Sequence, residues 1–244
     1  MLASALLAAA LAIAGWGWMT GRSLPARIAA LAGRASRPRM ICVWALGTAA
    51  AYGLTSILAL ALLGQVEAVR TMPVELRAFA WRVGLPGAAD AAALTWLAAW
   101  LAVGIGSGAA IVAVRRRLGK RPLALPYRSP AAARAADERL PAALLALAAG
   151  VGEELFFRLL IPLLCALAFG SAAIGFALSL ALFTALHRHQ GLLGMAAAGL
   201  AGAWLTYLYL LTGAVWVVAA LHVAVDLRAL LLPPAVSSSA AIRS

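Results

Sequence analysis

The sequence LPAALLALAAGVGEELFFRLLIPLLCALAF, residues 140–169, decides the fold class of this chain. It is an apolar run that is interrupted by only three charged residues, Glu153, Glu154 and Arg158. The run exceeds the roughly 20 residues that a helix needs to cross a bilayer. Each charge inside such a helix costs at least about 2.5–3.5 kcal/mol on insertion scales, so charged residues there usually face a cavity or one another. The stretch therefore predicts a membrane helix that carries a polar site.

The composition extends this prediction to the whole chain. Of 244 residues, 65% are hydrophobic and 11% are charged, and the mean hydropathy is +0.96. These values are too apolar for a soluble domain. We predict an all-α, polytopic transmembrane helical bundle of about seven spans: Leu2–Met19, Ile41–Leu63, Ala91–Val114, Leu140–Phe169, Ser171–Leu186, Gly191–Leu211 and Ala214–Leu232.

The distribution of basic residues predicts the orientation of the chain. Arginine and lysine concentrate in residues 22–39 and 115–139, whereas the loop over residues 67–90 is nearly balanced in charge. The positive-inside rule places both basic loops in the cytoplasm, with the N-terminus outside and the C-terminus inside. The net charge of +12 belongs to these loops, so nucleic acid is not an expected partner. We expect a multi-pass protein of the inner (plasma) membrane.

The chain divides into three parts. Residues 1–139 hold the N-terminal helices and a basic linker, residues 140–232 hold the polar spans, and residues 233–244 form a short tail. Pro162 predicts a kink, because it cannot donate to the carbonyl of Arg158. Cys42 and Cys165 predict neither a disulfide nor a metal site.

Helical spacing sorts the charged residues of the fourth span into a pair and a single residue. Glu154 and Arg158 are four residues apart and lie on one face, so they can pair. Glu153 is rotated by roughly 100° from Glu154 and escapes that pair. A desolvated, unpaired carboxylate suits a general base or acid. The alternative interpretation is a salt bridge that anchors the helix, with a spare glutamate at a wet interface.

Polar residues recur in two later spans. His187 ends the fifth span, and it shares a face with Phe183. His222 and Asp226 are four residues apart in the seventh span, a spacing that suits an oriented imidazole or a metal ligand. The alternatives are an interfacial histidine at residue 187 and a satisfied interhelical pair at 222 and 226. We expect a solvated role for His189.

Three motifs in this order resemble a known family. Glu153 to Arg158 resembles an EExxxR motif, Phe183 to His187 an FxxxH motif, and His222 to Asp226 an HxxxN/D motif. The pattern, over about residues 140–232, resembles that of the CAAX protease and bacteriocin-processing (CPBP) family of intramembrane proteases.

The resemblance implies an intramembrane endopeptidase that acts on a membrane-associated protein or peptide, with its active site towards the cytoplasm. Glu153 would activate a water, and His187 and His222 would position that water or stabilise the oxyanion. Glu154 and Arg158 would hold the helix geometry. Asp226 stands where asparagine is frequent in the family; there it would favour a protonated His222 or add a metal ligand.

Two questions follow from the resemblance. The family has been described both as metalloproteases and as glutamic-type proteases. Glu153, His187 and His222 are candidate zinc ligands, but the HExxH spacing is absent, so the favoured interpretation requires no cofactor. The alternative function is non-catalytic: a proton-coupled transporter, or a binding or immunity factor. A proton relay would need polar residues towards the outer side, and the polar spans offer few.

Overall fold

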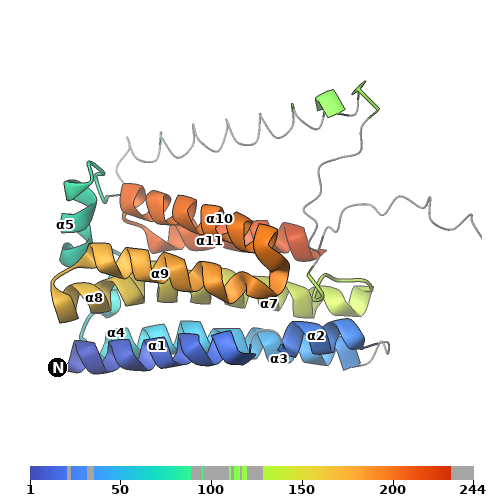
Figure 1. The fold of residues 1–244 in the computed structure, drawn as a ribbon, viewed down its shortest axis with the longest axis horizontal. Coiled ribbons are helices and arrows are strands. Elements are labelled where there is room, and N and C mark those ends of the chain that lie inside the picture. Colours follow the sequence, from blue (N-terminus) through green and yellow to red (C-terminus); the bar gives the residue numbers. More distant parts are fainter. Residues whose placement is uncertain are drawn as a thin grey trace, which may run out of the picture.

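The computed structural model describes residues 1–20, 23–31, 36–88 and 129–231, together with residues 95, 110, 113–115 and 117–119. Within these residues the chain forms helices and turns, without a β-strand. Most of the long helices lie side by side along the long axis of the molecule (Figure 1). The predicted all-helical fold is confirmed for this part of the chain.

The helices fall into two groups along the sequence. The N-terminal group comprises α1 (Leu2–Thr20), α2 (Ser23–Ala30), α3 (Ser36–Thr48), the π-helix η1 (Ala49–Leu54), α4 (Thr55–Leu62), the short 3₁₀ helix η2 (Val66–Val69) and α5 (Val74–Arg82). The C-terminal group comprises η3 (Ala136–Glu138), α7 (Arg139–Glu154), the π-helix η4 (Leu155–Leu160), α8 (Ile161–Phe169), α9 (Ala172–Leu186), η5 (His187–Gln190), α10 (Gly191–Thr212) and α11 (Val215–Leu231).

Several of the helices match the predicted spans. By length and composition, three stretches of the described residues can cross a membrane: Leu2–Ala30, Ser36–Leu62 and Ala172–Thr212. The last of these folds back on itself as α9 and α10, and so accounts for two predicted spans (Figure 1). The predicted span Ala91–Val114 lies almost entirely outside the described residues, as does the tail 233–244. The seven-span topology and the orientation of the termini stay predictions.

A continuous helix forms the centre of the bundle. It consists of α7, η4 and α8, which are 16, 6 and 9 residues long. Its middle is fully buried, and Phe156, Leu159 and Leu160 have no exposed surface. Helices α3 and α11 pack against α7, whereas α1 and α9 pack against α8. This central position explains why apolar residues surround the three charges on all sides.

The central helix widens where the sequence predicted a kink. The π-helix η4 comes directly before α8, which carries Pro162 in its first turn. In a π-helix the carbonyl of residue i pairs with the N–H of residue i+5, and Pro162, at i+5 from Phe157, has no N–H. The Phe157 carbonyl instead accepts a hydrogen bond from the Ser179 hydroxyl on α9. The sequence predicted that Pro162 leaves the carbonyl of Arg158 without its helical hydrogen bond. In the structure, the carbonyl of Phe157 accepts a hydrogen bond from outside the helix.

A buried ion pair joins the two groups of helices. Arg37 on α3 donates from Nε to Glu138 Oε1 at 2.8 Å, and the two side chains are 4% and 3% exposed. Arg37 also donates to the carbonyls of Ile28 and Pro130, each at 3.0 Å. The second oxygen of Glu138 accepts from the backbone N–H of Arg134 at 2.8 Å. These hydrogen bonds engage both charged groups and offset the desolvation cost of burying them.

We expect Glu138→Gln to destabilise the protein by about 3 kcal/mol at neutral pH, because it leaves the Arg37 charge buried without a counter-charge. Burial alone raises the pKa of Glu138, but the hydrogen bonds and charges of Arg37 and Arg134 lower the pKa below its ordinary value. A lowered pKa in the folded state means that this stabilisation is complete above the ordinary glutamate pKa of about 4.3, and is lost as the pH falls through the folded-state pKa.

Thermal unfolding of the wild type and of Glu138→Gln in detergent, between pH 7 and pH 3, measures this contribution. The difference in Tm should shrink towards the acid end of the range. A difference that stays constant with pH would show that the carboxylate charge contributes nothing.

Candidate active site

The structure brings the sequence-predicted polar residues together from three parts of the C-terminal group. Glu153 and Glu154 end α7, and Arg158 lies on η4 one turn later. His187 begins η5 directly after α9. His222 and Asp226 lie on α11, which packs along α7. All of these side chains are buried or half-buried.

A missing side chain on α7 allows α11 to approach. A Cβ atom on Gly150 would lie 2.6 Å from the backbone nitrogen of Val223, a distance that real Cβ atoms do not show. The absence of a side chain at Gly150 therefore permits direct contact between the two backbones. One turn later on α7 this contact places Glu154 against His222, the neighbour of Val223.

Glu154 is the centre of the polar cluster. Its side chain is 0% exposed, and its Oε1 lies 3.0 Å from Arg158 Nη1. The same oxygen lies 2.7 Å from Nδ1 of His222. The pairing with Arg158 agrees with the sequence prediction, whereas the contact with His222 is an addition. Glu154 thus connects the central helix to α11 as well as to the next turn of its own helix.

Arg158 is held on three sides. Besides Glu154, its guanidinium donates from Nη2 to the carbonyl of Gly202 on α10 at 3.4 Å. Its Cζ lies 4.2 Å from the centre of the Phe183 ring on α9, in a cation–π arrangement. The side chain is 2% exposed. Arg158 therefore contacts α9 and α10 while it neutralises a carboxylate on its own helix.

His222 has a carboxylate on each side of its ring. Because a carboxylate oxygen can only accept, Nδ1 donates to Glu154. Nε2 faces Asp226 Oδ2 at 3.7 Å, which is close enough for charge attraction but too long for a hydrogen bond. Two flanking carboxylates suit a ring in which both nitrogens carry hydrogen. The Nε2 hydrogen then remains available to a substrate oxygen.

Glu153 is the carboxylate of the cluster that forms no ion pair among the described residues, whereas Glu154 and Asp226 each pair through one oxygen. Oε2 of Glu153 is buried and has no hydrogen-bond partner among the described residues. Glu153 interacts electrostatically with His222, Glu154 and Arg158, and also with Asp226. The carboxylate therefore lies beside the cluster without being bound by it, as expected from its rotation relative to Glu154.

His187 presents one ring nitrogen to the site. Its Nδ1 donates to the backbone carbonyl of Phe183 at 2.7 Å, which leaves Nε2 as an acceptor. The ring packs on Phe183 with centroids 4.6 Å apart, and Phe183 lies 6.2 Å from the His222 ring. Phe183 thus separates and orients the two histidines. Its position one turn before His187 explains the FxxxH spacing.

His189 differs from the solvated role that we predicted. It is half-buried, and its ring lies 6.0 Å from His187 and 6.4 Å from Trp44 on α3. Its Nδ1 is 3.2 Å from the carbonyl of Leu186. His189 therefore packs at the edge of the cluster.

The candidate zinc ligands do not form a metal site in the described part of the chain. No group of three His, Cys, Asp or Glu side chains there could hold a metal ion. Both nitrogens of His222 face carboxylates, and Nδ1 of His187 is bound to a carbonyl. In these positions Glu153, His187 and His222 are not grouped as ligands of one metal ion.

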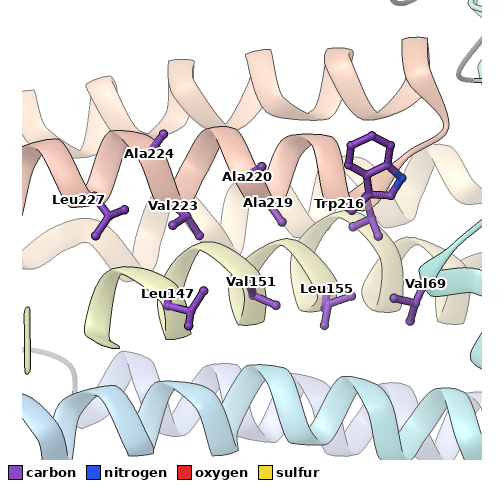
Figure 2. Close-up of a pocket in the computed structure, with 11 residues that line it drawn as sticks. Val69, Leu147, Val151, Leu155, Trp216, Ala219, Ala220, Val223, Ala224 and Leu227 are labelled. Carbon is purple, nitrogen blue, oxygen red and sulfur yellow. The ribbon is translucent and has the colours of Figure 1, made fainter. Parts of the chain in front are cut away.

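An apolar groove lies beside the cluster, between α7 and α11. Its volume is about 450 Å³, and it is lined by Val69, Leu147, Val151, Leu155, Val215, Trp216, Ala219, Ala220, Val223, Ala224 and Leu227. Figure 2 shows Val151 and Leu155 on one wall, and Val223 and Trp216 on the other. Two of the lining residues, Leu155 and Val223, are the chain neighbours of Glu154 and His222, and no residue of the polar cluster lines the groove.

A comparison with known protein families gives a match for the C-terminal part of the chain. Residues 136–228 match a protein-family model described as type II CAAX prenyl endopeptidase Rce1-like. This match confirms the resemblance inferred from the three motifs, and its range includes all of them. No curated protein matches the chain. No solved structure matches it either.

Proposed function

We propose that the protein is an intramembrane endopeptidase of the glutamic type. Residues 136–228 match the model of the Rce1-like family of type II CAAX prenyl endopeptidases, which supports the protease activity. The observation that carries the proposal is that two adjacent carboxylates have different partners. Oε1 of Glu154 pairs with both Arg158 and His222, whereas the carboxylate of Glu153 forms no ion pair or hydrogen bond among the described residues. Oε2 is buried without a hydrogen-bond partner in both residues.

The proposed reaction begins with a water held between Glu153 and Nε2 of His187. Glu153 takes a proton from the water as its oxygen attacks the carbonyl carbon of the substrate peptide bond. The resulting oxyanion accepts a hydrogen bond from Nε2 of His222, whose other nitrogen is fixed by Glu154. The proton on Glu153 then passes to the amide nitrogen as the C–N bond breaks. Asp226 balances the charge on His222.

The groove between α7 and α11 supports a substrate with a hydrocarbon portion. Its lining residues are apolar or aromatic, and its volume is about 450 Å³. The family description names a prenyl endopeptidase. We therefore propose a membrane-associated substrate whose lipid lies in this groove, with the peptide extending to the cluster from the cytoplasmic side of the plasma membrane.

A cleavage assay in proteoliposomes tests the proposed function. Purified wild-type protein is mixed with a peptide that ends in a prenylated CAAX sequence, and the products are identified by mass spectrometry. We expect cleavage by the wild type, a higher KM for the same peptide without its prenyl group, and an inactive Glu153→Gln protein. Equal cleavage by wild type and Glu153→Gln would reject the mechanism.

We expect the active protein to contain no stoichiometric zinc, because no group of three His, Cys, Asp or Glu side chains among the described residues is placed to hold a metal ion. Metal analysis of a purified preparation, combined with a cleavage assay in the presence of a chelator, measures this. Zinc at one ion per chain, together with loss of cleavage on chelation and recovery on addition of zinc, would contradict the glutamic mechanism.

A further inference from the structure

We propose that Tyr52, on the π-helix η1 of the N-terminal group, is a positioning residue of the active site whose hydroxyl holds the carboxylate of Glu153. Tyr52 lies outside the segment 136–228 that matches the family. The inference rests on the proposed function, since it takes Glu153 as the base.

Two glycines bring η1 against the end of α7. A Cβ atom on Gly152 would lie 3.1 Å from the backbone nitrogen of Gly53 and 3.5 Å from Cβ of Tyr52. The two backbones are therefore in direct contact at Gly53 and Gly152. Gly53 follows Tyr52 on η1, and Gly152 precedes Glu153 on α7. The contact therefore brings the backbones of Tyr52 and Glu153 close together.

The ring of Tyr52 is fixed by aromatic residues of η4. Its centroid lies 5.0 Å from that of Phe156 and 5.4 Å from that of Phe157. Phe157 in turn lies 5.5 Å from Phe183, the residue that packs on His187. The N-terminal group thus reaches the catalytic cluster through a continuous chain of rings. Such contacts fix the direction of the Tyr52 side chain.

The hydroxyl of Tyr52 and the carboxylate of Glu153 are chemically complementary groups. Among the described residues the hydroxyl makes no hydrogen bond, and neither does Glu153 Oε2. The two side chains are close enough to interact electrostatically. A hydroxyl is a donor and a carboxylate is an acceptor, so a direct bond, or a bond through one water, satisfies both. Both π-helices, η1 and η4, lie at this contact, and such turns are frequent at functional sites.

Gly17 on α1 makes room for the hydroxyl. A Cβ atom at this position would lie 3.1 Å from the Tyr52 hydroxyl oxygen and 3.4 Å from Cδ2 of Leu186, the residue before His187. A Cβ atom on Gly15, two residues earlier on the same helix, would meet nothing within 4 Å. The two glycines therefore provide a matched pair of substitutions.

The first test compares Tyr52→Phe with the wild type in the cleavage assay. The substitution keeps the ring and its packing but removes the hydroxyl. We expect kcat to fall about tenfold, as for loss of a hydrogen bond to a charged group, with KM within twofold and an unchanged Tm. Tyr209→Phe is the control, since its hydroxyl is buried without a partner among the described residues; it should retain full kcat.

The second test is a double-mutant cycle with Gly17→Ala. In the wild-type background the new methyl group displaces the hydroxyl, so kcat should fall severalfold, whereas Gly15→Ala should be neutral. In the Tyr52→Phe background the displaced atom is absent, and Gly17→Ala should cost no more than Gly15→Ala. A purely structural role for the ring does not produce this non-additivity.

Two results would overturn the inference: a kcat for Tyr52→Phe within twofold of the wild type, or an equal cost of Gly17→Ala in both backgrounds. Either result leaves the proposed function intact, provided that the wild type cleaves and Glu153→Gln does not. If the wild type fails to cleave, the proposed function itself is wrong, and the inference about Tyr52 falls with it.

Discussion

Glu153→Gln should lower kcat for peptide cleavage by about 10²- to 10⁴-fold, the usual contribution of a general base. Glutamine has the shape of glutamate and keeps an acceptor oxygen, but it cannot take a proton from water. Because the buried Oε2 of Glu153 has no partner among the described residues, no ion pair is broken by the change. We therefore expect KM and Tm to stay close to those of the wild type. Steady-state cleavage in proteoliposomes at equal protein amounts measures kcat.

The control for this prediction is Glu67→Gln. Glu67 is 79% exposed and pairs only loosely with Arg70, at 3.9 Å, so its substitution should leave cleavage unchanged. Glu154→Gln is the informative comparison, because it should weaken the fold as well as the activity. If Glu153→Gln cleaves within threefold of the wild type while Glu154→Gln is folded and inactive, the roles of the two carboxylates are reversed.

Arg158→Met should reduce the free energy of unfolding by about 3–5 kcal/mol, the cost of breaking a buried ion pair by removing one partner. The substitution leaves the fully buried Glu154 with His222 alone, and it also removes the contacts with Phe183 and the Gly202 carbonyl. The protein should accumulate poorly in the membrane, and its Tm in detergent should fall.

Arg70→Met is the matched control for the arginine, since its side chain is 82% exposed and such pairs contribute at most about 1 kcal/mol. Arg158→Lys should recover part of the stability, because lysine keeps the charge but lacks the planar fork. An Arg158→Met protein with the Tm of the wild type would show that the pair with Glu154 is incidental to folding.

Contacts within one helix could be predicted from the sequence. Helical periodicity predicted that Glu154 faces Arg158 and that His222 faces Asp226, and both pairs are present in the structure. The contact between Glu154 and His222 could not be predicted in this way, because it depends on how closely two helices approach. That approach depends on Gly150 against Val223, and one glycine among 22 carries no signal of its own in the sequence.

The N-terminal residues show a second limit of sequence reasoning. Arg37 was assigned to a cytoplasmic loop by the positive-inside rule, yet it is buried against Glu138. Tyr52 lies in an apolar run without a motif, and its place near Glu153 depends on the π-helix η1. A π-helical turn has no periodic sequence pattern of its own, so its position cannot be predicted from the sequence and is known only from the folded structure.

The pair of Glu154 and Arg158 also has a consequence for biosynthesis. If the fourth and seventh predicted spans cross the bilayer, α7 and η4 enter it before α11, with His222, has left the ribosome. During this interval a lone carboxylate would face lipid at a cost of several kcal/mol. Arg158, four residues away on the same helix, provides a counter-charge from the moment the turn forms. Arg158 thus neutralises Glu154 within the nascent helix, and His222 joins the cluster once α11 packs against α7.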